Sequence, residues 1–176
     1  MKKISVFEIT LIALFAALLV AVQVGLAFLP NVELVSILII IFTMILQVKV
    51  VYVIAVFVVA EGVIYGFGTW WFCYLYVWLI LAAAAYIFRK KREPLFWALL
   101  NGIFGLLFGT LCSFVYLFVL GAAGAFSWIL SGLIFDVIHA VSNFITALVL
   151  FKPLSSAADV LMKKLGRESY MIKNRR

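Results

Sequence analysis

The sequence predicts an all-α integral membrane protein with six transmembrane helices and both termini in the cytoplasm. Three observations support this fold class. First, 68% of the 176 residues are hydrophobic and only 12% are charged, a composition with which a soluble domain would expose large apolar patches. Second, several apolar runs approach or exceed the ~20 residues that cross a bilayer. Third, the Lys and Arg residues lie at the chain ends or in short breaks between these runs, as expected of topology signals.

Each predicted span is bounded by polar, glycine or proline residues. The spans are Val6–Leu29, two short helices within Val32–Phe67, Trp70–Phe88, Leu95–Leu120 and Phe126–Phe151. The first ends at Pro30, "RKKR" follows the fourth, "GAAG" follows the fifth, and Lys152-Pro153 closes the sixth. Residues 1–153 therefore form the predicted transmembrane domain. Residues 154–176 form a basic cytoplasmic tail that begins with a short surface helix.

The charge distribution decides whether residues 32–67 cross the membrane once or twice. The only break in this stretch is Gln47-Val48-Lys49. With two spans, Lys2, Lys3, Lys49, "RKKR" and every basic residue after position 151 fall on one side, and the opposite loops contain no Lys or Arg. One span would move "RKKR" to the side opposite the N-terminus. The positive-inside bias therefore favours six spans.

Motifs that would indicate catalysis are missing from the sequence. It contains no GxxxxGK[ST] phosphate loop, no HExxH and no acidic DxxD pair, so we expect neither an enzyme nor a cofactor bound by this chain. The net charge of +7 follows from the topology signals, and we expect no nucleic-acid partner. If the protein moves a substrate uphill, another chain supplies the energy.

The predicted topology places four ionisable residues in the outer half or near the midplane of the spans: Glu33, Glu61, Asp136 and His139. Such groups are costly in a membrane and usually face a cavity or a partner. Asp136, His139 and Asn143 follow an i, i+3, i+7 spacing, so they share one helix face. This face is either a polar stripe that packs against other helices, the polar floor of a ligand pocket, or part of a proton relay.

The stretch "GTWWFCYLYVW" is unusually aromatic. Trp71, Tyr74 and Trp78 are also spaced i, i+3, i+7, and they descend about 10 Å from the outer boundary. This depth favours a pocket wall over an interfacial belt, for which Trp70 alone is suited. A purely structural aromatic face is the alternative. Glu61 and Tyr65 on the preceding helix can line the same outer end, and Asn31 and Glu33 in the outer turn complete the predicted substrate-binding set.

The predicted cavity has aromatic walls, carboxylates and amides but no Lys or Arg. This disfavours a ligand held by a carboxylate or phosphate group. It favours a flat, neutral or amine-bearing ring compound, although backbone amides at a helix N-terminus can also hold an anion.

Small residues recur every fourth position in two predicted helices. In the first they are Ala13, Ala17, Ala21 and Gly25, a face that suits either a partner subunit or the bundle itself. In the fifth they are Gly105, Gly109 and Ser113, for which we predict packing within the bundle.

Together these residues resemble the substrate-binding S component of an energy-coupling factor (ECF) transporter, over almost the whole chain to about Pro153. The resemblance rests on the six-helix N-in, C-in build and on an AxxxA pattern, either Ala13–Ala17 or Ala17–Ala21. It rests also on the outer turn "LPNVEL", Leu29 to Leu34, and on "FDVIHAVSNF", Phe135 to Phe144.

This resemblance implies an S-component-like bundle in a bacterial cell membrane, with no activity of its own. The subunit would capture a B-type vitamin or related micronutrient from outside. It would dock through Ala13, Ala17 and Ala21 on a membrane coupling subunit seated on two ATP-binding-cassette ATPases, which bind the ATP. The cation-poor pocket favours riboflavin, pyridoxine, thiamine or its pyrimidine precursor, or cobalamin over pantothenate, biotin or folate. The alternatives are an MreD-like scaffold of the cell-envelope machinery and an autonomous proton-coupled carrier.

Overall fold

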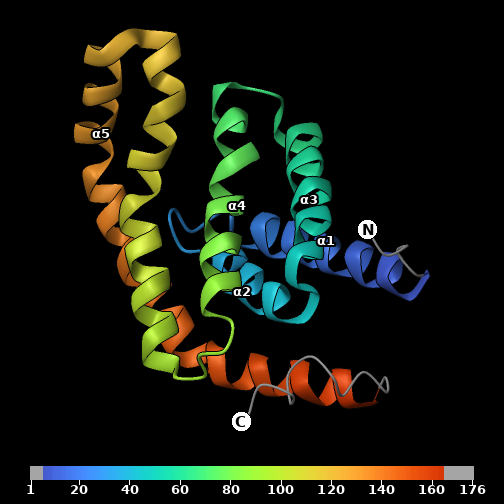
Figure 1. Ribbon diagram of the computed structural model, residues 1–176. Helices are drawn as coiled ribbons and strands as arrows, with labels where there is room; N and C mark the ends of the chain where they lie inside the picture. Colours follow the sequence, from blue (N-terminus) through green and yellow to red (C-terminus); the bar gives the residue numbers. More distant parts are fainter. Residues whose placement is uncertain (1–5, 165–176) are drawn as a thin grey trace.

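The computed structural model describes residues 6–164, and all their regular secondary structure is helical, as predicted. The elements are α1 (Val6–Leu26), α2 (Val35–Leu46), the 3-10 turn η1 (Gln47–Lys49), α3 (Val50–Tyr65), α4 (Thr69–Phe88) and α5 (Pro94–Lys164). Figure 1 shows that α5 folds back on itself. The reversal occurs at Gly121, whose φ of 70° and ψ of −178° are non-helical and suit glycine. We call residues 94–120 the first arm of α5 and residues 122–164 its second arm.

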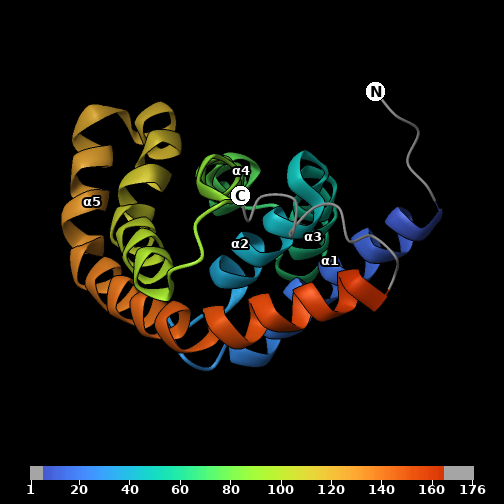
Figure 2. The same ribbon diagram turned by 60° about the horizontal axis from the view of Figure 1, so that its bottom comes forward.

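The helices are arranged in two directions. In Figure 1, α3, α4 and both arms of α5 run alongside one another, whereas α1 and α2 run across them. Figure 2, which brings the bottom of this view forward, shows the last part of the second arm also turning across the molecule. Helix α1 packs mainly on α3, and α2 packs mainly on α4 and α5.

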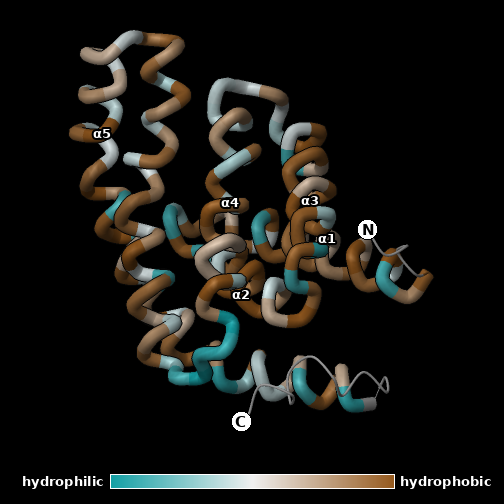
Figure 3. The backbone as a smooth tube through the Cα atoms, viewed as in Figure 1, coloured by the Kyte–Doolittle hydropathy of each residue, from teal (hydrophilic) through white to brown (hydrophobic). Residues whose placement is uncertain are grey.

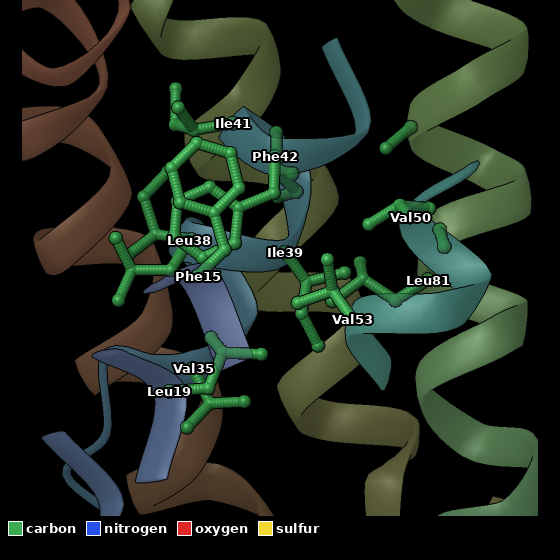
Figure 4. Packing of buried hydrophobic residues seen from close by; sticks show 14 of the residues in the cluster. Phe15, Leu19, Val35, Leu38, Ile39, Ile41, Phe42, Val50, Val53 and Leu81 are labelled. Atoms are coloured by element: carbon green, nitrogen blue, oxygen red, sulfur yellow. The ribbon is translucent and has the colours of Figure 1, made fainter. Parts of the chain in front are cut away.

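Helix α2 forms the centre of the hydrophobic core. All 12 of its residues are buried, which is expected because the segment "VSILIIIFTMIL" is apolar on every side. Phe42 of α2 stacks on Phe15 of α1 with ring centroids 4.0 Å apart, and Figure 4 shows Val35, Ile39 and Val53 packed nearby. The helix is about 18 Å long, shorter than the ~30 Å hydrocarbon core of a bilayer.

The length and polarity of the helices are consistent with an integral membrane protein. Among the described residues, four helical segments are long and apolar enough to cross a membrane: Val6–Leu26, Val35–Tyr65, Thr69–Phe88 and Pro94–Lys163. The last of these contains both arms of α5. Large apolar side chains are exposed along these segments, for example Val63 at 71% and Phe118 at 75%. Lipid is the solvent that makes such exposure favourable.

The basic breaks of the described chain lie at one end of the molecule. Lys49 Nζ lies 2.7 Å from Glu8 Oε1, so the α2–α3 junction meets the start of α1. Arg92 lies 3.9 Å from Asp159 on the second arm, and Met162 lines a small cavity together with Glu8 and Lys49. Figure 3 shows the hydrophilic α4–α5 connection and the adjoining part of α5 at the lower end.

Some predicted boundaries were wrong. The sixth predicted helix does not end at Lys152-Pro153, because the second arm continues through Pro153 to Lys164. A proline inside a helix removes one hydrogen bond and kinks the helix, and it does not always end it. The predicted connection between the fifth and sixth spans, residues 121–125, is reduced to a turn at Gly121, and α1 ends at Leu26 instead of Leu29. Lys2, Lys3 and residues 165–176 of the predicted tail lie outside the described residues.

Candidate ligand-binding site

A cavity of about 350 Å³, here called cavity A, lies where the α1–α2 turn meets α3, α4 and both arms of α5. Most of the predicted binding residues line it: Asn31, Glu33, Glu61, Tyr65, Tyr74, Trp78 and His139. Gln23, Trp70 and Phe108 also line it, and no Lys or Arg is among the described residues of its wall. This volume is within the range of small-molecule sites.

The α1–α2 turn places two polar residues over cavity A. After α1 ends, Leu29 N donates to Leu26 O at 2.8 Å and Val32 N to Leu29 O at 3.2 Å. Asn31 has a φ of 59°, a left-handed conformation that asparagine tolerates better than most residues. These tight turns reverse the chain, so that Asn31 and Glu33 both reach the cavity wall.

Glu33 already has partners within the protein. Its Oε2 accepts a hydrogen bond of 2.8 Å from the backbone N of Ser36, its Oε1 accepts one from the Ser36 hydroxyl, and His139 Nε2 lies 3.4 Å from Oε1. The carboxylate thus caps the start of α2, where the helix dipole favours negative charge. Burial raises the pKa of Glu33, but the hydrogen bonds and attraction from His139 and the hydrogen bonds from Ser36 lower it by more. The net pKa lies below its ordinary value.

The predicted Asp136–His139–Asn143 face is divided among three environments. His139 reaches cavity A. Asn143 is fully buried, donates to Ser36 Oγ at 3.4 Å, and its backbone O accepts from Asn101 Nδ2 at 3.0 Å. Asn143 is therefore a packing residue in this structure, which is the structural alternative considered for the face.

Asp136 lines a second cavity of about 420 Å³, cavity B, between the two arms of α5. Its Oδ1 accepts a hydrogen bond of 3.0 Å from Gly109 N. Asn31 and Phe108 line both cavities, so cavity B adjoins cavity A. Asp136 does not line cavity A.

The aromatic wall of cavity A contains Tyr74 and Trp78 of α4, as predicted, but Trp70 takes the place predicted for Trp71. Trp70, Tyr74 and Trp78 are its α4 members, at i, i+4 and i+8. The ring centroids are 5.1 Å apart for Trp70–Tyr74 and 5.3 Å for Tyr74–Trp78, both edge to face. Phe108 of the first arm continues the wall, with its centroid 5.6 Å from that of Trp78 and 5.1 Å from that of His139.

Trp71, which the sequence predicted in this wall, points to α3 instead. Its Nε1 donates a hydrogen bond of 2.8 Å to Val58 O, and its ring packs on Phe67 at 5.1 Å. The reason is Gly62, because a Cβ there would lie 2.8 Å from Trp71 Nε1. Trp70, predicted as a belt residue, takes the wall position.

Two residues that line cavity A each carry a polar atom with no hydrogen-bond partner within the described chain. The two atoms are Glu61 Oε1 and Trp78 Nε1, which belong to residues only 1% and 2% exposed. Buried polar atoms are nearly always paired, because leaving one unpaired costs about 1–3 kcal/mol. The carboxylate can accept a hydrogen bond and the indole N–H can donate one, so a small polar molecule that reaches these atoms can pair with both.

The small residues of the fifth predicted helix pack inside the bundle, as expected. A Cβ on Gly105 would meet the backbone of His139 at 2.9 Å, and one on Gly109 would meet Asp136 Oδ2 at 2.5 Å. The first-helix set differs, because Ala13, Ala17, Ala21 and Gly25 are all exposed. Helix α1 buries the opposite face, with Leu11, Phe15 and Leu19.

Some wall residues were not predicted. Gln23 and Phe108 belong to no spacing pattern that separates them from other polar and aromatic residues of their helices. Gly62, the single glycine of α3, was the available sign that one α4 tryptophan would approach α3. Comparison of the chain with protein-family models, with curated proteins and with solved structures finds no match.

Proposed function

We propose that this protein is the substrate-binding S component of an ECF-type importer in a bacterial cell membrane. It captures a vitamin or related micronutrient from outside, and partner subunits drive uptake with ATP. The observation that carries this proposal is cavity A. Its wall combines aromatic rings with the unpaired Glu61 and Trp78 atoms, which is the composition of a small-molecule site.

The proposed topology has six spans with both termini in the cytoplasm. It is supported by the gathering of Lys49, Arg92 and the end of α5 at one end of the molecule. Cavity A includes the α1–α2 turn and residues beside the α3–α4 turn, such as Tyr65 and Trp70, which carry no basic residues. In this topology α1 and α2, which run across the other helices (Figure 1), are steeply tilted in the bilayer, and α2 is a partial span because it is too short to cross the hydrocarbon core alone.

The exposed face of α1 supports docking to a coupling subunit. Its small residues allow another helix to approach closely, and Ala13, Ala17 and Ala21 are exposed. In this proposal two ATP-binding-cassette ATPases attach to the coupling subunit and bind the ATP. The S component itself has no enzymatic activity and needs no cofactor.

An autonomous proton-coupled carrier is the second candidate, and the Glu33–His139 pair favours it. Two ionisable groups 3.4 Å apart beside a cavity are an arrangement that proton relays in transporters use. The two candidates differ in their energy source. An MreD-like scaffold needs no ligand cavity, and no contact of the described residues favours it.

Mass spectrometry of the full chain purified in detergent tests the proposal. We expect a co-purified small molecule that is lost in Glu61→Gln and Trp78→Phe but retained in Glu93→Gln, which changes a carboxylate in the α4–α5 connection. Uptake of that compound into proteoliposomes should require the coupling subunit, both ATPases and ATP. Uptake by the chain alone under a proton gradient would favour the carrier, and a protein that binds no compound would favour the scaffold.

A further inference from the structure

The two carboxylates of cavity A are in different states. Glu33 is engaged by Ser36 and His139 through both of its oxygens. Glu61 is 1% exposed, and its Oε1 has no hydrogen-bond partner in the described chain. A ligand that enters cavity A therefore meets one carboxylate that is already paired and one that is not.

No basic side chain of the wall can neutralise Glu61. The described lining residues of cavity A contain no Lys or Arg, and the cavity's His139 lies beside Glu33. Isolated buried carboxylates are strongly disfavoured unless a cation or hydrogen-bond donors reach them. The cavity volume of about 350 Å³ is about ten times the ~30 Å³ share of one water molecule, so a larger molecule can supply those donors.

The unpaired indole N–H of Trp78 indicates a second polar group that a complementary ligand should carry. Trp78 Nε1 is a donor without an acceptor among the described residues, and Trp70 and Tyr74 line the same cavity. A complementary ligand carries an N–H donor for Glu61, an acceptor for Trp78 and a flat ring for the aromatic wall. Cationic rings gain further from the aromatic faces.

We propose that the substrate is a planar heteroaromatic amine or amidine, with its N–H group on Glu61 and a ring acceptor on the indole N–H of Trp78. This inference rests on the proposed function, since it takes cavity A as the substrate site. It disfavours substrates whose main polar group is a carboxylate or a phosphate, because no Lys or Arg is among the described residues of the wall to pair with either group.

Binding of three probes with one ring system tests this. The probes are 2-aminobenzimidazole, benzimidazole and benzimidazole-2-carboxylate, titrated calorimetrically into the full chain in nanodiscs after removal of any co-purified compound. We expect the amine to bind at least about tenfold more tightly than the carboxylate, because hydrogen bonds to charged groups are worth about 1.5–3 kcal/mol. Glu61→Gln should weaken the binding of the amine by a similar factor without weakening the binding of the carboxylate. Glu93→Gln should change the affinity of neither probe.

Three results would overturn the inference: equal or tighter binding of the carboxylate, unchanged amine binding in a folded Glu61→Gln variant, or no amine binding at millimolar concentration. Unfolding temperature and gel-filtration profile establish that the variant is folded.

Trp78→Phe keeps an aromatic ring and removes the N–H, so it should weaken the binding of both the amine and benzimidazole. ATP-dependent uptake of an anionic vitamin would overturn this inference and leave the proposed function intact. Glu61-dependent amine binding without ATPase-dependent uptake would support this inference and overturn the proposed function.

Discussion

His139 Nε2 lies 3.4 Å from Glu33 Oε1, and this contact joins the turn before α2 to the second arm of α5. The two residues are 106 positions apart in the sequence. Their side chains are 7% and 12% exposed, so water screens the contact only weakly. The pair therefore holds the wall of cavity A together from two distant parts of the chain.

We predict that Glu33 and His139 are energetically coupled. His139→Gln should lower the free energy of unfolding by about 1–3 kcal/mol, because the buried carboxylate loses a partner. Glu33→Gln should have a similar effect, and the double variant should lose less than the sum of the two. Urea unfolding in detergent of all four proteins measures this coupling, and strictly additive losses would contradict it.

Stability should depend on pH through Glu33. Its folded-state pKa lies below the ordinary 4.5 because hydrogen bonds and attraction outweigh the effect of burial. A carboxylate with a lowered pKa stabilises the folded state above the unfolded-state pKa, and this stabilisation is lost as pH falls through the folded-state pKa. Thermal unfolding below about pH 5 should therefore show a smaller fall in stability in Glu33→Gln than in wild type. The pKa of the exposed Glu93 is also lowered, by hydrogen bonds from backbone N–H groups including that of Arg92, so Glu93→Gln should change the profile in the same direction, and solvent makes that change smaller than the one in Glu33→Gln. An identical pH profile in wild type and Glu33→Gln would refute the assignment.

Gly109→Ala should destabilise the contact between the two arms of α5. The new Cβ would lie 2.5 Å from Asp136 Oδ2, which forces the carboxylate away and weakens its hydrogen bond from Gly109 N. We expect a loss of about 1–3 kcal/mol. Gly132→Ala is the matched control, because a Cβ there meets no atom within 4 Å and alanine favours a helix by up to about 1 kcal/mol. Equal effects of both substitutions on the unfolding temperature would argue against this close packing.

The six-span topology predicts opposite sides for the turns at either end of α3. Val48 and Phe67 are exposed at 65% and 59%, whereas native Cys73 and Cys112 are buried. A membrane-impermeant maleimide added to intact cells should label Phe67→Cys and should label Val48→Cys only after permeabilisation. Labelling of both from outside would mean that residues 35–65 do not cross the membrane.

The exposed face of α1 should be needed for docking and not for ligand binding. Ala17→Leu places a larger side chain on this face, where it prevents close helix approach. We expect loss of co-purification with the coupling subunit and unchanged probe binding. Ala83→Leu, at an exposed alanine on α4, should leave both unchanged. Retention of the complex in Ala17→Leu would move the docking surface elsewhere.

The sequence was informative where one segment determines its own environment. The continuous apolar composition of α2 predicts its burial, and the charged or glycine breaks at Lys49, Arg89 and Gly121 predict where helices end or turn. Glu33, Glu61 and His139 were identified because ionisable groups in apolar segments require a partner or a cavity. Each of these inferences needs only local sequence and the cost of polar groups in an apolar solvent.

The predictions that differ from the structure concern residues whose environment depends on contacts with another segment of the chain. Trp70 and Trp71 are adjacent and chemically identical, and Gly62 on α3 determines which of them faces cavity A. The helix through Pro153 continues because the second arm is anchored beyond it by buried Ser155, Ala158 and Met162, contacts that a helix-ending rule does not include. Asn143 and Asp136 left the predicted site because Ser36 and Gly109 offer them partners.

The complete enclosure of α2 has a consequence for how the bundle opens. All 12 of its residues are buried, so solvent reaches its amide groups only when the surrounding helices separate. Hydrogen–deuterium exchange of α2 therefore reports the cooperative opening of the whole bundle. Exchange at the ends of the outer helices reports local fraying. Because Glu33 caps α2 from the wall of cavity A, we expect a molecule held in that cavity to slow the exchange of α2, although no residue of α2 lines the cavity.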